Sequence, residues 1–349
     1  MKRSIWLILS LAITTISMTT SAFATKIEMQ RAQFDAVYKD VKAGKKTATS
    51  HLKDYPLYPY LEYEKIRRHL KSTSEKDLLT FIDKYKNTPL SDKLWSHWLG
   101  RLAKQKKWRK IVSVYSPLAA DTSARCYYFE ALIHKGDKAS AMKEAGKLWM
   151  SSKSKPKACN SLFKKLKSAG YLTKEKYWQR IELATNAGNS KLARSLIKHL
   201  PNDEQKIAEQ YVVSHRNPKR ALKSKHVGGG KYSRKVIAHA VKRIARKNYK
   251  KGYKTWRQYK TKYTFSKQEK HEVEAYLAVR ASFNHDQGAL KSFSGIPAEH
   301  RNDEANVWMA RMALREGKWQ QLNSAIDAMS EEVAQRDIWQ YWKARASSQ

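Results

Sequence analysis

Three patterns in the sequence come close to motifs that carry chemistry, and spacing excludes two of them. Gly228-Gly229-Gly230-Lys231 resembles a phosphate-binding loop, which needs a Gly five residues before its last Gly and Ser or Thr after its Lys. Lys225 and Tyr232 occupy those positions, so we interpret the segment as a mobile basic turn. His271-Glu272 begins like a zinc-protease motif, but Ala275 stands where the second His belongs. No Gly-x-Ser-x-Gly elbow occurs either.

Carboxylates form the third pattern, because a pair of them can act as general acid and base. A catalytic acid needs a raised pKa and hence a pocket that shields it from water. The candidates lie in helical segments among Lys and Arg, where a solvated ion pair is the usual role: Glu62, Glu64, Glu182, Glu331 and Glu332. We therefore predict no catalytic residue in this chain, and we expect no cofactor.

The first residues have the pattern of an export signal. Lys2 and Arg3 precede an apolar stretch, and Ala22-Phe23-Ala24 has the small–x–small form of a cleavage site. This predicts a signal peptide over residues 1–24, cleaved after Ala24; the alternative is an uncleaved membrane anchor. No later stretch reaches the ~18 apolar residues of a membrane span, so we expect none.

Export would place the two cysteines of the chain in an oxidising compartment. Cys126 and Cys159 are an even pair in an oxidising compartment, which favours a disulfide worth about 3–4 kcal/mol. We expect no metal site, because no further Cys or His lies at short spacing beside these thiols.

The net charge is +39, from 70 Lys and Arg against 31 Asp and Glu. Behind a signal peptide the available polyanions are wall peptides and outer-membrane lipid phosphates, so we expect no nucleic-acid partner. The alternative is an ordinary solvated surface of a Lys-rich protein, since the lysines are spread over the whole length.

The elements that position these residues are predicted to be helices. The 349 residues include only 13 Gly and 8 Pro, which is too few for the many tight turns of a sandwich or barrel. Apolar residues at i, i+3, i+4 and i+7 form helix pairs, joined by Gly-containing turns near 136, 188 and 317. This predicts an all-α fold: a superhelical α-solenoid of tetratricopeptide-like helical hairpins over residues 25–349, with a flexible joint near 226–232.

One segment is long and unusual enough to indicate a family. In the run from Leu52 to Tyr63, Pro56 and Pro59 end one helix and set a rigid entry to the next. This run resembles, nearly letter for letter, the start of the superhelical domain of soluble lytic murein transglycosylases. Further similar stretches follow in the same order and extend the resemblance from about Gln30 to Ala346: Cys126-Tyr127-Tyr128, Ser154 to Cys159, Leu183 to Asn189 and Ile338 to Trp342.

The resemblance implies a periplasmic protein with a disulfide between Cys126 and Cys159. In that family a C-terminal lysozyme-like domain cleaves MurNAc–GlcNAc β-1,4 bonds without water and leaves 1,6-anhydro ends. Its marks are a Glu followed by Ser, then Gly-Leu-Met-Gln, then Ala-Tyr-Asn-Ala-Gly, and none occurs in this sequence. We therefore expect a superhelical domain without the catalytic domain, either as a truncated or split gene product or as a scaffold kept as a binding module.

The leading functional prediction is a scaffold that binds peptidoglycan glycan strands or wall peptides. Tyr and Trp rings would stack on sugars, and Lys or Arg would pair with carboxylates. Tyr55, Tyr58, Tyr60 and Tyr63 are the predicted binding residues, with core packing as the alternative role. The alternative function is a periplasmic protein–protein adaptor, whose partner could be a wall enzyme or a separate catalytic chain.

Overall fold

The computed structural model describes residues 27–347, and in this range the chain forms helices and no strand. The predicted all-α fold is confirmed. The predicted signal peptide, with its cleavage site after Ala24, lies outside the described residues. None of the described helices is long and apolar enough to cross a membrane.

The described residues divide into two compact units. Unit 1 comprises residues 27–149 and 155–171, and unit 2 comprises residues 150–154 and 172–347. The short segment 150–154 belongs to unit 2 because its carbonyls accept hydrogen bonds there. Arg180 Nε donates to the Ser151 carbonyl at 3.2 Å, and Asn189 Nδ2 donates to the Ser152 carbonyl at 3.2 Å.

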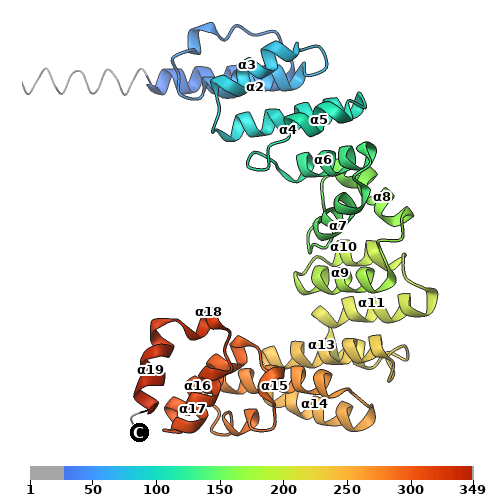
Figure 1. Ribbon diagram of the computed structural model, residues 1–349, viewed down its shortest axis with the longest axis vertical. Coiled ribbons are helices and arrows are strands. Elements are labelled where there is room, and N and C mark those ends of the chain that lie inside the picture. The colour runs from blue at the N-terminus through green and yellow to red at the C-terminus, as the bar shows by residue number, and fades with distance from the viewer. Residues whose placement is uncertain (1–26, 348–349) are drawn as a thin grey trace, which may run out of the picture. The chain divides into compact units, whose positions relative to one another are not determined.

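Unit 1 runs from the blue to the green helices of Figure 1. Its first helix covers residues 27–43. The following elements are η1 (Ser50–Leu52), α2 (Tyr58–Arg68), α3 (Glu75–Lys84), α4 (Pro89–Lys104), α5 (Trp108–Val114), α6 (Thr122–Lys135), α7 (Lys138–Trp149), η2 (Lys157–Cys159) and α8 (Asn160–Ser168).

The two longest helices of unit 1 after the first, α4 and α6, have clear start signals. Thr88 caps α4, with Pro89 at its first position, and the Asp121 side chain caps α6. Helix α6 ends at Gly136, whose φ of +102° is open to glycine at little cost. Together α4 and α6 bury an apolar core around Trp98. The core residues are Leu94, Leu99, Leu102, Ile111, Ala124 and Ala131.

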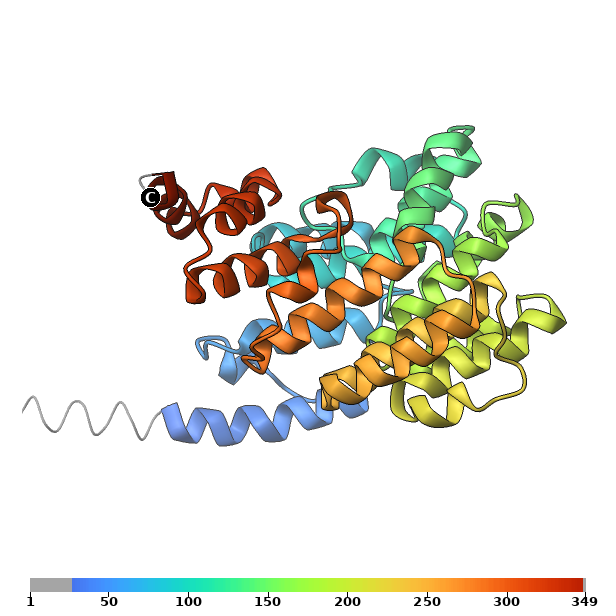
Figure 2. The same cartoon turned by 90° about the horizontal axis from the view of Figure 1, so that it is seen from below.

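Unit 2 runs from the green to the red helices. Its elements are α9 (Lys174–Asn186), α10 (Ser190–Ile197), α11 (Asn202–Arg216), α12 (Pro218–Leu222), α13 (Lys231–Lys247), α14 (Tyr249–Lys262), α15 (Lys267–Phe283), η3 (Lys291–Phe293), η4 (Ala298–His300), α16 (Asp303–Arg315), α17 (Trp319–Asp327), α18 (Glu331–Ala334) and α19 (Asp337–Ser347). Helices α13, α14 and α15 lie side by side, as both views show (Figures 1 and 2).

The predicted helix pairs are present as hairpins. The turns at 136, 188 and 317 connect α6 to α7, α9 to α10 and α16 to α17, and each pair is packed together. The predicted joint near 226–232 lies between α12 and α13, within unit 2. Its backbone is held at several points: Arg234 Nη1 donates to the Gly229 carbonyl at 2.8 Å, and the Val227 amide donates to the Ser224 carbonyl at 3.1 Å. Flexibility of this segment stays a prediction.

Candidate functional site

The predicted tyrosines do not share one surface. Tyr55 is 6% exposed and packs with the first helix, whereas Tyr63 is 8% exposed and belongs to the core around Trp98. Tyr58 is half-buried against the first of these cores. Only Tyr60, at 43%, is an exposed ring. The binding role of these residues therefore stays a prediction, and Tyr63 is the one that lines a hollow.

That hollow has a volume of about 430 Å³ and lies where α2, α4 and α6 meet. Its lining combines aromatic, small polar and basic side chains: Tyr63, Leu70, Lys71, Lys93, Ser96, His97, Gly100, Arg101, Lys104, Asp121, Ser123 and Tyr127. The His97 imidazole forms a hydrogen bond of 3.2 Å with the Tyr63 hydroxyl. Burial, reinforced by Arg67, lowers the pKa of His97, so this ring is neutral at neutral pH.

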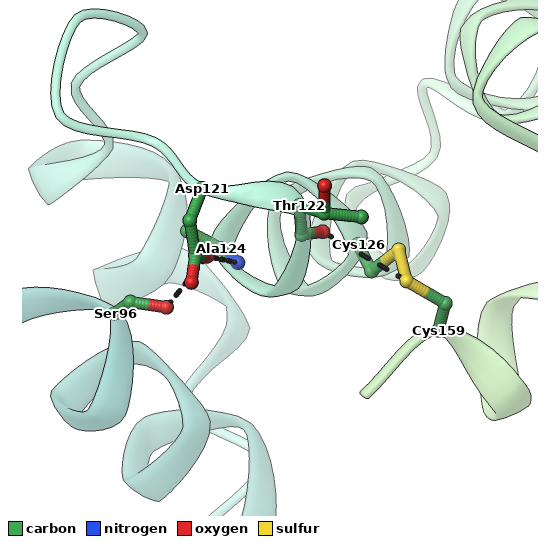
Figure 3. Close-up of a disulfide and its surroundings, with 6 residues drawn as sticks. All are labelled: Ser96, Asp121, Thr122, Ala124, Cys126 and Cys159. Carbon is green, nitrogen blue, oxygen red and sulfur yellow. Dashed lines mark hydrogen bonds between the residues drawn. A yellow bond between two sulfur atoms is a disulfide. The ribbon is translucent and has the colours of Figure 1, made fainter. Parts of the chain in front are cut away.

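The carboxylate in this hollow has structural partners. Asp121 Oδ1 accepts from Ser96 Oγ at 2.7 Å and from the Ala124 amide at 2.8 Å (Figure 3). These bonds hold α4 against the start of α6 and place the negative charge at the helix N-terminus, where it is stabilised. Asp121 therefore has a structural role and fixes the wall of the hollow.

Tyr127 separates this hollow from a second one. Gly100 makes room for the ring, because a Cβ at position 100 would lie 3.0 Å from the Tyr127 hydroxyl oxygen. Burial raises the pKa of Tyr127, which stays a neutral donor. The second hollow has a volume of about 830 Å³ and shares Tyr127 and Lys104 with the first. We call the two adjoining hollows the unit 1 groove.

The second hollow has an aromatic wall. The rings of Trp108 and His134 are stacked, with centroids 4.3 Å apart and planes 4° apart. Burial, together with Lys165, lowers the pKa of His134, so the stack is uncharged at neutral pH. The remaining lining residues are Ala103, Lys106, Glu130, Lys157, Ala158 and Ser161. Such a flat aromatic face suits a sugar ring or another planar group.

A disulfide ties opposite walls of this second hollow together. Cys126 on α6 is bonded to Cys159 at the end of η2, with Cα atoms 5.1 Å apart (Figure 3). The expected disulfide is therefore present in the structure. Tyr127 and Glu130 follow Cys126 on α6, and Lys157 and Ala158 precede Cys159, so the crosslink fixes the width of the groove.

The groove has an excess of unpaired positive charge. Glu130 is engaged by Ser161 and by Lys165, whose ammonium is 4.0 Å away. The lysines of the groove form no ion pair with any of residues 27–347: Lys71, Lys93, Lys104, Lys106 and Lys157. Because ammonium groups attract anions and the aromatic faces attract sugars, the groove is suited to an anionic glycan or a carboxylate-bearing chain.

The carboxylates considered in the sequence are engaged or exposed. Glu62 pairs with Lys84, Glu64 with Arg67, Glu182 with Lys235 and Glu332 with Arg336, at 3.0, 2.7, 2.5 and 3.9 Å. Glu331 is exposed. Within residues 27–347 no three His, Cys, Asp or Glu side chains lie close enough together to hold a metal ion.

Three residues of the groove carry no sequence motif: His97, Trp108 and His134. They lie on three helices, and tertiary packing alone brings them together. The one local signal is Gly100 inside α4, because a glycine within a helix often marks a close approach by another group.

No family model matches the chain. Its sequence is 26% identical to the soluble lytic murein transglycosylase of Escherichia coli K12 over 357 residues, covering 98% of this chain and 54% of that protein. It is 27% identical to the soluble lytic murein transglycosylase of Salmonella typhimurium over 303 residues, covering 84% of this chain and 46% of that protein. The chain thus spans about half the length of the curated relatives it matches.

Comparison with solved structures shows that the fold of the chain is also similar to that of lytic transglycosylases. An inactive mutant of the lytic transglycosylase Slt from Pseudomonas aeruginosa aligns with a TM-score of 0.72 and 27% identity, covering 90% of this chain and 52% of that one. The soluble lytic transglycosylase Slt70 from E. coli aligns with a TM-score of 0.60 and 26% identity, covering 92% and 52%. Over nearly its whole length, the chain is therefore similar in sequence and fold to about half of a soluble lytic murein transglycosylase.

Proposed function

We propose that this chain is the superhelical, peptidoglycan-associated part of a soluble lytic murein transglycosylase and that it works in the periplasm. It holds glycan strands or wall peptides and does not cleave them by itself. The family activity, non-hydrolytic cleavage of MurNAc–GlcNAc bonds, belongs to a catalytic partner, either in a further domain or in a separate chain.

The observation that carries this proposal is the similarity to soluble lytic murein transglycosylases along 98% of the chain. The unit 1 groove supplies a physical site for it. Carboxylates of wall peptides would pair with its unpaired lysines, such as Lys104 and Lys157, and sugar rings would stack on Trp108 and His134.

The test is co-sedimentation of the purified chain with purified sacculi, with the released muropeptides analysed by mass spectrometry. We expect the chain to pellet with the sacculi at low salt and to dissociate toward 1 M salt, where charges are screened beyond about 3 Å. We expect no anhydro-muropeptides above a control without protein. Failure to pellet would contradict wall binding, and release of anhydro-muropeptides would contradict a non-catalytic role.

A protein–protein adaptor is the second candidate, and one observation favours it. Ile338 and Tyr341 on α19 are 53% and 58% exposed, although Trp339 on the same helix is buried. Exposed apolar side chains that lie close together on a helix are typical of a surface that binds a protein. Recovery of a wall enzyme with the wild-type chain, but not with a variant carrying Ile338→Ser and Tyr341→Ser, would support this function.

A further inference from the structure

Unit 2 contains a small hollow with a different charge pattern from the unit 1 groove. It has a volume of about 280 Å³ and lies between α13, α15 and the start of α16. Its lining residues are Lys242, Glu272, Ala275, Tyr276, Val279, His300, Asn302 and Glu304. We call it the unit 2 hollow, and its size is that of a site for a small molecule.

Lys242 contributes the ammonium group of this hollow, and no carboxylate of residues 27–347 lies within ion-pair distance of it. Its side chain is half-buried and forms no ion pair with any described residue, and its ammonium lies 5.9 Å from the centroid of the Tyr276 ring. Burial lowers the pKa of Lys242, and the charge of Glu272 opposes this shift. A desolvated ammonium with three donors and no ion pair is unfavourable, so a ligand carboxylate beside Lys242 would be stabilised.

Two carboxylates on the exposed side of the hollow also lack a cation. Glu272 accepts only a neutral hydrogen bond, from Gln268 Nε2 at 3.0 Å, and Glu304 forms no ion pair among residues 27–347.

Other carboxylates of α15 are neutralised. Glu269 pairs with Arg234, and Glu274 pairs with Lys260, each at 3.0 Å. Lys242, Glu272 and Glu304 thus line the hollow without forming an ion pair among residues 27–347, in a chain where cations far outnumber anions.

We propose that the unit 2 hollow binds a small zwitterion, a free amino acid or a short peptide with both of its ends free. The ligand's carboxylate pairs with Lys242, and its ammonium lies between Glu272 and Glu304. A ligand with both charges satisfies all three side chains at once, which a simple anion or cation cannot do. This inference concerns helices of unit 2 and does not depend on the proposed function.

The binding test is isothermal titration calorimetry of the full chain with glycine, L-alanyl-L-alanine and D-alanyl-D-alanine. We expect saturable binding of at least one of them. We expect its N-acetylated form and its amidated form, which each lack one charge, to bind at least about tenfold more weakly. Absence of binding by all three probes overturns the proposal, and so does equal binding of the singly charged forms.

Substitutions of the lining residues test whether the ligand binds in the hollow. Lys242→Met should weaken zwitterion binding at least about tenfold, whereas Lys247→Met, which removes an exposed lysine of the same helix, should leave it unchanged. Glu304→Gln should weaken binding as well, and Glu299→Gln should not. Lys242→Met removes a desolvated charge, so we expect its unfolding temperature to be equal to or above that of the wild type. Unchanged binding by folded Lys242→Met overturns the proposal.

Discussion

The unit 1 groove and the unit 2 hollow differ in where their carboxylates find partners. In the groove, Asp121 and Glu130 are held by hydrogen bonds within the protein, and the surrounding lysines are left without anions. In the hollow, Lys242, Glu272 and Glu304 form no ion pair with any residue of the described range, although the charge of Glu272 acts on Lys242. The same lysine-rich composition thus supports two different proposed sites, one for an anion and one for a zwitterion, because packing decides which charges stay without an ion pair.

The largest expected effect is that of removing the disulfide, which should lower the stability of unit 1 and leave the binding site of unit 2 intact. Replacing both cysteines, Cys126→Ala and Cys159→Ala, should lower the stability of unit 1 by about 3–4 kcal/mol, since the bond closes a loop across 33 positions. By calorimetry we expect the unit 1 transition to fall by roughly 10 °C. Binding to sacculi should weaken because the groove walls separate, while zwitterion binding by unit 2 should persist. Equal losses in both activities would contradict the separation of the two sites.

Acidification should lower the stability of unit 2 more than that of unit 1. Burial, with charge from His215, Arg243 and Lys242, lowers the pKa of His239 on α13 to about 3. Its folded pKa lies below its unfolded value of about 6.5, so the stability it contributes is complete above that value and is lost as pH falls toward 3. Between pH 7 and pH 4 this one group should cost about 3 kcal/mol.

Thermal unfolding of the wild type and of His239→Leu at the two pH values measures this cost. The variant should lose clearly less stability on acidification than the wild type does. An identical pH dependence in both proteins would show that His239 is not the acid-sensitive group. His97→Leu in unit 1 serves as the matched control for His239→Leu, because burial also lowers the pKa of His97. The loss of stability on acidification is compared between the two variants.

The smallest expected effect tests the wall between the two halves of the groove. Gly100→Ala places a methyl group 3.0 Å from the Tyr127 hydroxyl oxygen. It should destabilise the protein by about 1 kcal/mol, because this crowding outweighs the gain in helix propensity of roughly 0.5–1 kcal/mol. Tyr127→Phe removes that hydroxyl, so the double variant should recover part of the loss. Denaturant unfolding of the four proteins gives the coupling energy, and purely additive losses would mean that Gly100 does not serve to admit Tyr127.

The fold could be predicted from sequence because its signals are local. The turn at Gly136, the apolar spacing of the flanking helices and the scarcity of Gly and Pro all reflect backbone conformation or helix periodicity. The disulfide was likewise predictable, because the two thiols are the only cysteines of the chain.

The sites could not be predicted in the same way, because their residues meet only through packing between helices. Tyr55 and Tyr63 belong to one unusual sequence run, yet the structure buries both. Tyr55 lies in the turn between η1 and α2 and packs into the core of the first helix, whereas Tyr63 on α2 packs into the core around Trp98. Trp108 and His134 are far apart in sequence and stack only because α5 packs on α6. Likewise, the unpaired state of Lys242 depends on which carboxylates of α15 reach other cations.

The most direct test of wall binding by the unit 1 groove compares two variants with the same net charge. One carries Lys93→Met, Lys104→Met and Lys157→Met in the groove. The other carries Lys86→Met, Lys138→Met and Lys143→Met at exposed positions of unit 1 outside it. In co-sedimentation with sacculi at about 0.1 M salt, we expect the groove variant to bind at least about tenfold more weakly than the wild type, and the control variant to bind nearly as well. An equal loss of binding in the two variants, or no loss in either, would contradict binding of the wall by the unit 1 groove.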